Sequence, residues 1–451
     1  MSKKQPNILW IFSDQHRAHA IGCYGDPNIE TPNLDRLARE GIRFTNAYSN
    51  TPLCSPFRAS LYTGQYISTH GVISLFRPLL PEKQPELAEA LRRNGYHTSH
   101  MGKWHLSGGD CPCHFVSPYF RPGWDDWLGW ENSNDFLNTT YSIGDHPHPV
   151  RRLEGYQTDA LTDLTVEWLR EHADSGPWFH VMSIEPPHGA MPQLYPDNPN
   201  FAPEPYMAMF RGKPLQYRPN FASNHPRRAE FERNLRGYYA QIKNLDDNIG
   251  RVIQVLEETH QLDNTVIFYF SDHGDLMGSH GMLHKCRPEE ESSNIPLIVR
   301  YPVRIPANTV SDALISAVDI MPTLLGFLGI PVPEGVEGQD LSPVLEGRRG
   351  KGAELVLMQF ESAFFPETPQ TAFRAIRTGH WLYSFFLTRG PAQLFNMQND
   401  PYQQANLISS PEAGGIRGEL HRMMEAKVAE FGDDFLERAK RYSTGNKGLS
   451  G

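Results

Sequence analysis

The sequence predicts an α/β protein with a mainly parallel sheet sandwiched by helices, followed by a small C-terminal α+β domain. Continuous apolar runs alternate with helical patterns along most of the chain, which is typical of parallel strands covered on both faces. Beyond Gly347 the pattern changes to closely spaced short strands and one helix, as in an antiparallel sheet. The 451 residues suffice for one large and one smaller domain. We therefore divide the chain into residues 1–350 and 351–451.

Five runs have the composition of buried strands, namely residues 7–12, 97–101, 178–184, 265–270 and 297–301. Helices are predicted between them, at 85–94, 158–172, 232–260 and 317–328. A further helix opens at Thr31-Pro32-Asn33, because Pro suits a first helical position, and Gly41 closes it. In the C-terminal part, strands are predicted at 355–360, 373–378, 381–387 and 393–397, and a helix at 416–431.

Two long stretches, 107–152 and 186–226, look irregular. Loops of this length in a compact domain often serve as lids or pocket walls, but they are also compatible with plain surface decoration. The pair Cys111 and Cys113 invites a zinc interpretation, yet no second matching pair follows. The five cysteines give no disulfide framework.

The net charge of -10 argues against a nucleic acid partner. No apolar stretch approaches the roughly 20 residues of a membrane span, so no membrane partner is expected. The first apolar run stops at Ser13-Asp14 without a small-residue cleavage site, which favours a core strand over a signal peptide. We therefore expect a cytoplasmic protein.

Two carboxylates that are far apart in the sequence directly follow predicted strands. Asp14 follows the first strand, and Asp272 follows the strand at 265–270. Ligands of parallel sheets bind beyond the carboxyl ends of the strands, so these two groups could hold one cation, with Gln15 and His273 completing the shell. Mostly oxygen donors favour Ca²⁺ or Mg²⁺, whereas His273 leaves Mn²⁺ or Zn²⁺ open. The alternative is that Ser271 to Gly274 form an ordinary turn.

The run L-C-S-P-F-R-A-S-L-Y-T-G, with Cys54, Pro56 and Arg58, is the most informative motif. Pro56 suits the first turn of a helix, whose free N–H groups would face an anion. Taken alone, Cys54 reads more readily as a buried structural cysteine. The partners of the motif favour the functional interpretation.

Three cationic segments follow in order, each beyond a predicted strand. They are Gly102-Lys103-Trp104-His105-Leu106, Pro186-Pro187-His188, and Lys285 within S-H-G-M-L-H-K. Each has an ordinary alternative, because exposed lysines are usually solvated and His188 could cap a turn. Five other histidines stay unassigned, namely His16, His19, His100, His280 and His284.

Together these segments resemble the sulfatase family of the alkaline phosphatase superfamily, over nearly the full length of the chain. The resemblance implies an alkaline-phosphatase-like fold and the oxidation of Cys54 to formylglycine by a maturation enzyme. The aldehyde hydrate would be the nucleophile, and its second hydroxyl would expel sulfate after the transfer. The family pattern further implies one divalent metal, with Ca²⁺ expected, on Asp14, Gln15, Asp272, His273 and residue 54.

The same resemblance implies roles for six catalytic residues. Cys54 would supply the nucleophile, and Arg58 and His105 would orient and deprotonate it. Lys103 and Lys285 would hold sulfate oxygens, and His188 would protonate the leaving oxygen. The expected substrate is a small sugar or aryl sulfate, and homo-oligomer formation is left open.

Two alternatives belong to other functional classes. Related formylglycine enzymes hydrolyse phosphonate monoesters or phosphate diesters, although Lys103 and His105 favour the sulfatase branch. If Cys54 is never oxidised, the chain would be a non-catalytic anion-binding protein.

Overall fold

The computed structural model describes residues 5–109, 113–348, 352–364 and 369–445. Its largest element is a ten-stranded sheet in the order β11-β2-β10-β9-β1-β8-β4-β5-β6-β7. The strands of this sheet are β1 (Asn7–Asp14), β2 (Ile42–Phe44), β4 (His97–Lys103), β5 (Asp126–Trp130), β6 (Thr140–Ile143), β7 (Arg151–Arg152), β8 (Trp178–Pro187), β9 (Thr265–Ser271), β10 (Leu297–Arg300) and β11 (Thr309–Ser311). The five central strands, from β9 to β5, are mutually parallel, and β10 and β6 run antiparallel to their neighbours.

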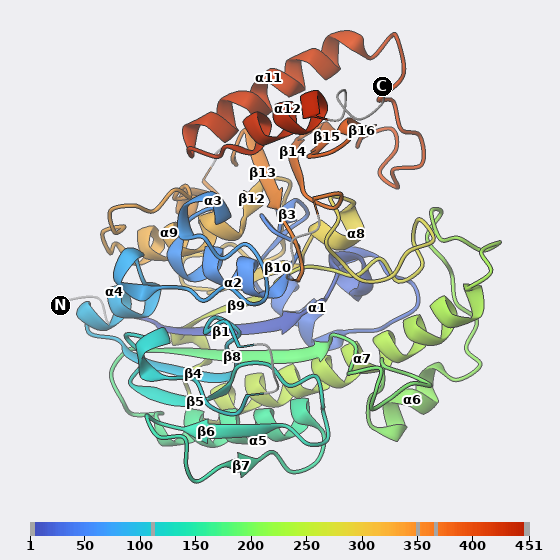
Figure 1. The fold of residues 1–451 in the computed structure, drawn as a ribbon. Helices are drawn as coiled ribbons and strands as arrows, with labels where there is room; N and C mark the ends of the chain where they lie inside the picture. The colour runs from blue at the N-terminus through green and yellow to red at the C-terminus, as the bar shows by residue number, and fades with distance from the viewer. Residues whose placement is uncertain (1–4, 110–112, 349–351, 365–368, 446–451) are drawn as a thin grey trace.

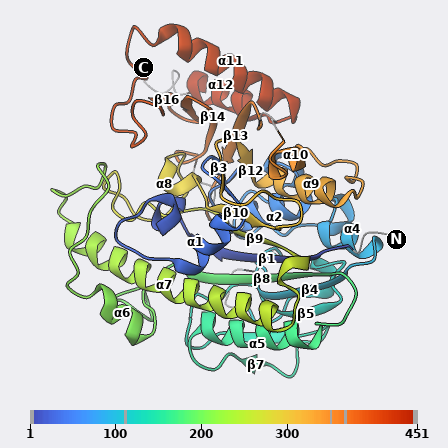
Figure 2. The ribbon, with the colours of Figure 1, turned by 180° about the vertical axis from the view of Figure 1, so that it is seen from behind.

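Helices cover both faces of this sheet (Figure 1). On one face lie α2 (Cys54–Thr63), α4 (Leu87–Arg93) and α9 (Ala317–Leu328), and on the other α1 (Pro32–Arg39), α5 (Gln157–Glu171) and α7 (Arg228–Glu258). Seen from behind, α7 runs beside α5 along the sheet (Figure 2). The shorter helices are α3 (Ile67–His70), α6 (Glu204–Phe210), α8 (Glu290–Ser293) and α10 (Ser342–Leu345). The predicted α/β class is confirmed.

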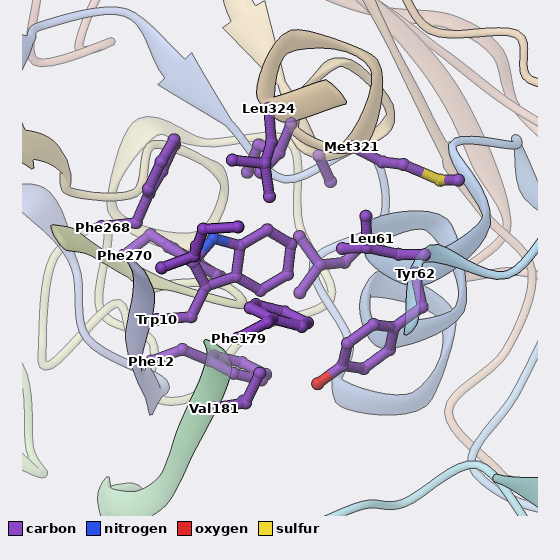
Figure 3. Close-up of a cluster of buried hydrophobic side chains, with 14 of the residues drawn as sticks. Trp10, Phe12, Leu61, Tyr62, Phe179, Val181, Phe268, Phe270, Met321 and Leu324 are labelled. Carbon is purple, nitrogen blue, oxygen red and sulfur yellow. The ribbon is translucent and has the colours of Figure 1, made fainter. Parts of the chain in front are cut away.

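The central strand β1 is buried on both faces, which explains why its residues from Ile8 to Phe12 are all apolar. Side chains alternate between the two faces of a strand, so Trp10 and Phe12 pack beneath α2 and α9 while Leu9 and Ile11 pack against α5 and α7. Figure 3 shows Trp10 surrounded by aromatic rings from neighbouring strands and by Tyr62 of α2. Burying each such side chain contributes roughly 1.5–3 kcal/mol. These contacts fix β1, and hence the position of its last residue, Asp14.

A second sheet lies at the C-terminal end of the chain. It is antiparallel, in the order β13 (Leu355–Phe360), β14 (Phe373–Thr378), β15 (Trp381–Phe386) and β16 (Gly390–Asn396), and α11 (Gly414–Glu430) packs on one face. The other face packs on the first unit around β3 (Ala47–Tyr48), which pairs with β12 (Ile315–Ser316). The predicted small α+β unit is therefore present. The boundary between residues 350 and 351 falls outside the described ranges and stays a prediction.

Several expectations were incomplete or wrong. The stretch 107–152 is not wholly irregular, because β5, β6 and β7 extend the large sheet there. The sequence did not predict β5 because this stretch is rich in Trp and Gly and looks like a loop. In the structure, Trp127 and Trp130 of β5 are buried. The stretch 186–226 contains α6, and α12 (Phe435–Gly445) follows the helix that was expected to be the last. Cys113 is disulfide-bonded, so the expectation of cysteines without a disulfide was wrong at this position, and Cys113 offers no free thiolate for a zinc ion. Cys111 lies outside the described residues. Across the described ranges, no helix is long and apolar enough to cross a membrane.

Candidate active site

The site lies at the carboxyl edge of the parallel strands. Asp14 ends β1, Lys103 ends β4, and Asp272 follows β9 directly. Because these strands are parallel and in register, with Ser13 opposite Ser271, their ends meet at one edge of the sheet. Cys54 is brought to this edge as the first residue of α2. Side chains that are up to 258 positions apart in the sequence are thereby placed in one cluster.

The core of the site is a buried cluster of Asp14, Cys54, Asp272 and His273, whose ligand-type atoms all lie within 4.8 Å of one another. Cys54 Sγ is 3.4 Å from His273 Nε2 and 3.6 Å from Asp14 Oδ1. The Oδ2 atom of Asp272 is buried and has no hydrogen-bond partner. An unpartnered buried carboxylate oxygen is costly, and a divalent cation would satisfy it. The residues present therefore fit a metal ion.

The two carboxylates titrate very differently. Burial, together with the charge of the nearby Asp14, raises the pKa of Asp272 to about 7. Burial would also raise the pKa of Asp14, but Lys103, with smaller effects from His188 and Lys285, holds it well below its usual value. Two adjacent buried carboxylates cannot both ionise at low cost, so the cluster favours a cation between them.

Two buried cations, Lys103 and Arg58, lie next to the carboxylates. Lys103, which is 1% exposed, donates a hydrogen bond of 2.8 Å from Nζ to Asp14 Oδ2. Arg58 donates from Nη1 to the Lys103 carbonyl at 2.8 Å and to Ser183 Oγ at 2.9 Å. Its Nη2 lies 3.5 Å from Asp14 Oδ2 and 4.0 Å from Asp272 Oδ2. Arg58 thus contacts the carboxylates, which differs from the expectation that it would reach the nucleophile directly.

Lys285 and Gln15 border the cluster. Lys285 donates from Nζ to Gln15 Oε1 at 2.5 Å and lies 3.5 Å from Cys54 Sγ. The Gln15 backbone N–H donates to Asp272 Oδ1 at 2.9 Å, and its side-chain amide donates to Asp275. The amide oxygen expected on a metal is therefore occupied by Lys285 in this structure.

Two histidines complete the predicted set. Burial, together with the charges of Lys103 and Arg58, holds the pKa of His105 well below its usual value. Burial and the Lys285 charge do the same for the pKa of His188. Both imidazoles are therefore neutral near pH 7. His188 is half-buried and, with Gln15 and Met277, lines a cavity of 170 Å³ beside the cluster. All predicted site residues thus lie in or around this cluster.

Sequence reasoning missed several residues of this region. Ser183 links Arg58 to the Lys103 carbonyl, to which its hydroxyl donates at 2.7 Å. Asp275 positions Gln15, and its place three residues after Asp272 was the only signal available. Asn134 and Asn200, from the two stretches expected to be loops, line the 170 Å³ cavity. That placement supports the pocket-wall interpretation of these stretches.

Comparisons with known proteins agree with this fold and site. A family model described as Sulfatase matches residues 6–330, and one described as N-sulphoglucosamine sulphohydrolase, C-terminal, matches residues 278–430. The chain is 35% identical to an ulvan-active sulfatase of Formosa agariphila, over 97% of this chain and 84% of that protein. It is 30% identical to an arylsulfatase of Clostridium perfringens, over 99% and 98%.

Further matches extend the range of relatives. An N-acetylglucosamine-6-O-sulfatase of Bacteroides thetaiotaomicron is 27% identical over 96% of this chain and 88% of that protein. The solved structure of yidJ from Bacteroides fragilis has a TM-score of 0.86 at 27% identity, covering 97% of this chain and 98% of that one.

The fold and site define a hydrolase of the alkaline phosphatase superfamily. Within that superfamily, the chain belongs to the sulfatase family, and it is a sulfatase.

Proposed function

We propose that this sulfatase removes sulfate from a small sulfated sugar or aryl sulfate, with a formylglycine derived from Cys54 as nucleophile. The observation that carries the proposal is the position of Cys54 at the start of α2, with Asp14, His273 and Lys285 within 3.6 Å of its sulfur atom. Two relatives whose names specify ulvan and N-acetylglucosamine support a sugar sulfate.

A divalent ion would be held by Asp14, Asp272, His273 and the modified residue 54, with Gln15 joining if it releases Lys285. Ca²⁺ is our first choice because the donors are mostly oxygen, and Mg²⁺, Mn²⁺ and Zn²⁺ are the alternatives. When bound, such an ion supplies positive charge to the nucleophile and to the sulfate oxygens.

The other residues of the site would bind the sulfate group and orient the nucleophile. Lys285 lies on the open side of Cys54, where its ammonium would bind sulfate oxygens. Lys103 donates to Asp14 in the free protein, and its ammonium would also hold sulfate oxygens when a substrate binds. Arg58 holds the carbonyl end of β4 in place and, with His105, would orient the nucleophile.

His188 would protonate the leaving oxygen. Its neutral state in the free protein is consistent with this role, since a bound sulfate ester brings a negative charge beside the imidazole and raises its pKa. The substrate would thereby create the acid that its own cleavage requires.

The first test compares Cys54→Ala with Cys23→Ala. Cys23 is a free, half-buried cysteine whose backbone N–H donates to Asp35, which is not a residue of the cluster. Turnover of an aryl sulfate should vanish in the first variant and persist in the second. Full turnover by Cys54→Ala would refute the proposal. Peptide mass spectrometry of residue 54 should show the mass loss from thiol to aldehyde, and an unmodified peptide from the native host would favour the anion-binding alternative.

A second test separates sulfatase from phosphonate monoester hydrolase activity. We expect kcat/KM to be higher for an aryl sulfate than for the matching aryl phosphonate, and the opposite ratio would reverse the assignment. A panel of sulfated sugars would then identify the organic part of the substrate. The maturation enzyme, the oligomeric state and the cytoplasmic location stay predictions.

A further inference from the structure

A polar cavity with aromatic residues in its walls lies apart from the site described above. It has a volume of 370 Å³, within the range of about 300–1,000 Å³ that is usual for small-molecule sites. It lies between the segment after β1, the segment 216–221 before α7, and Tyr402 of the C-terminal unit. Met277 is shared with the 170 Å³ cavity and separates the two.

The wall of this cavity includes Arg17, a buried arginine whose guanidinium makes no close ion pair among the described residues. Burial alone would lower the pKa of Arg17, but nearby tyrosines and the more distant carboxylates of Asp26 and Glu291 raise it. Arg17 is only 2% exposed, and its Nε is buried without a hydrogen-bond partner. The one bond that its guanidinium makes among the described residues is a long one, 3.5 Å from Nη1 to the Leu276 carbonyl. Within the described ranges, no carboxylate oxygen lies within 4.0 Å of this guanidinium. A buried charge normally needs a partner, so an anion in the cavity would complete the site.

The remaining lining selects the kind of anion. The lining residues include Tyr24, Tyr217, Tyr239, Tyr402 and Asp26. The Tyr239 hydroxyl donates to Asp26 Oδ2 at 2.7 Å, and the Tyr24 hydroxyl donates to the Leu297 carbonyl at 3.2 Å. A bare inorganic anion would be repelled by Asp26. An acidic sugar would place its anionic group on Arg17, donate a hydroxyl to Asp26 and lay its ring against tyrosine.

Arg218 adds a second guanidinium at the same wall. It is already paired with Glu291 at 2.8 Å and lies over the Tyr402 ring, 5.0 Å from its centroid. Among the described residues, Arg17 is therefore the guanidinium of this wall that makes no close ion pair, whereas the charge of Arg218 is already paired with Glu291. The surroundings of Arg17 are held firmly, because Tyr238 Oη accepts from the Arg17 backbone N–H at 2.9 Å and donates to the Gln15 carbonyl at 2.6 Å.

We propose that this cavity is a second, non-catalytic binding site for a monosaccharide-sized acidic sugar, with Arg17 as its anion-binding residue. The site is separate from the cluster around Cys54, so a failure of the proposed catalytic roles would not refute it, and its own failure would not refute those roles. A sugar carboxylate and a sugar sulfate share the required chemistry, and the test distinguishes them.

Calorimetric titration with sodium glucuronate, with glucose as the neutral control, tests the proposal on the full-length protein. We expect glucuronate to bind and glucose to bind at least about tenfold more weakly, because one charge-assisted interaction is lost. Arg17→Met should abolish glucuronate binding, whereas Lys285→Ala, which alters the catalytic cluster, should leave it unchanged. Loss of binding in Lys285→Ala with retention in Arg17→Met would overturn the proposal.

A second variant keeps the test decisive if Arg17→Met does not fold. Gln216 lines the cavity, and its side chain is exposed. Gln216→Glu adds a negative charge at the mouth and should weaken glucuronate binding about fivefold, as expected for roughly 1 kcal/mol of repulsion. Gln5→Glu adds the same charge before β1, at the opposite end of that strand, and should have no effect. Equal affinities in the two variants would overturn the proposal.

Glucose 6-sulfate, titrated into Cys54→Ala protein so that no turnover occurs, decides which anionic group is preferred. Tighter binding than glucuronate, again lost in Arg17→Met, assigns the site to sugar sulfates, and weaker binding assigns it to uronates. Binding of neither sugar to Cys54→Ala protein refutes the site.

Discussion

The ion pair of Lys103 and Asp14 makes a strong prediction about stability. Replacing Lys103 with Met keeps much of the side-chain volume but removes the ammonium that lies 2.8 Å from Asp14 Oδ2. At an effective dielectric constant of about 20, that contact has a Coulomb energy of about 6 kcal/mol. Desolvation offsets part of this energy, and breaking a buried pair by removing one partner costs about 3–5 kcal/mol.

We therefore expect Lys103→Met to lose about 3–5 kcal/mol of unfolding free energy in metal-free protein. Urea unfolding followed by tryptophan fluorescence, with chelator present, measures this loss. Lys427→Met is the control, because Lys427 pairs with Glu430 at 3.0 Å on a partly exposed helix surface and lies over the Phe431 ring, so its loss should be about 1 kcal/mol.

Two further measurements test why Lys103→Met should lose this much unfolding free energy. Adding a divalent ion should shrink the loss, since the ion would take over the charge of Asp14. The double variant Asp14→Asn/Lys103→Met should recover part of the stability, because the Asp14 carboxylate is then no longer left buried without Lys103, although Arg58 loses its contact with Asp14 as well. A loss below about 1 kcal/mol in metal-free Lys103→Met would refute the argument, as it would place the pair in the range of surface ion pairs.

Three other predictions concern the metal, the C-terminal unit and pH. Chelation should lower the thermal midpoint of the wild type and Ca²⁺ should restore it, whereas an unchanged midpoint would argue against a resident ion. Arg374 is 2% exposed and lies between Glu361 and Asp433. Replacing Arg374 with Met should lower the free energy of unfolding by about 3–5 kcal/mol, as measured by urea unfolding. Asp246 accepts hydrogen bonds from α1, including Leu34 N–H at 2.8 Å, and burial raises its pKa to about 6. A carboxyl whose folded pKa lies above its unfolded value stabilises the fold at low pH and loses that contribution as pH rises through about 6. Asp246→Asn should therefore gain stability relative to the wild type, by up to about 3 kcal/mol, between about pH 4 and about pH 7. If the stability difference between Asp246→Asn and the wild type did not change with pH, the raised pKa of Asp246 would be contradicted.

The sequence was most informative where strands position the site. Asp14 and Asp272 could be placed at one sheet edge because apolar runs precede them and parallel strands end together. Lys285 has no such local signal, since it lies between β9 and α8 in a segment without regular structure, and only the family resemblance singled it out. The strand β5 escaped prediction because its buried tryptophans sit among Gly and Asp, which resemble a loop.

Local patterns also could not show which partners meet across the fold. The Ser183 hydroxyl and the Arg58 guanidinium converge only because β8 pairs with β4 in the sheet and α2 packs on one face of that sheet. The cavity walls come from segments as distant as Asn28 and Tyr402. Such contacts depend on tertiary packing rather than on periodicity, so a single sequence carries no signal for them.

The structure also separates the parts that do chemistry from the parts that select the substrate. Helix α2 is buried along its whole length, so Cys54 is held by packing and has little freedom to adapt. The half-buried members of the cluster's border are His188 and Lys285, and each lines a cavity, of 170 Å³ and 300 Å³ respectively. The organic part of a substrate must therefore leave the cluster on this side.

The first cavity is lined mainly by residues of the large unit, whereas Phe360 and Arg389 of the C-terminal unit line the second. Substitutions in these walls should change which sulfate ester is accepted, and substitutions at strand ends should change whether any ester is cleaved.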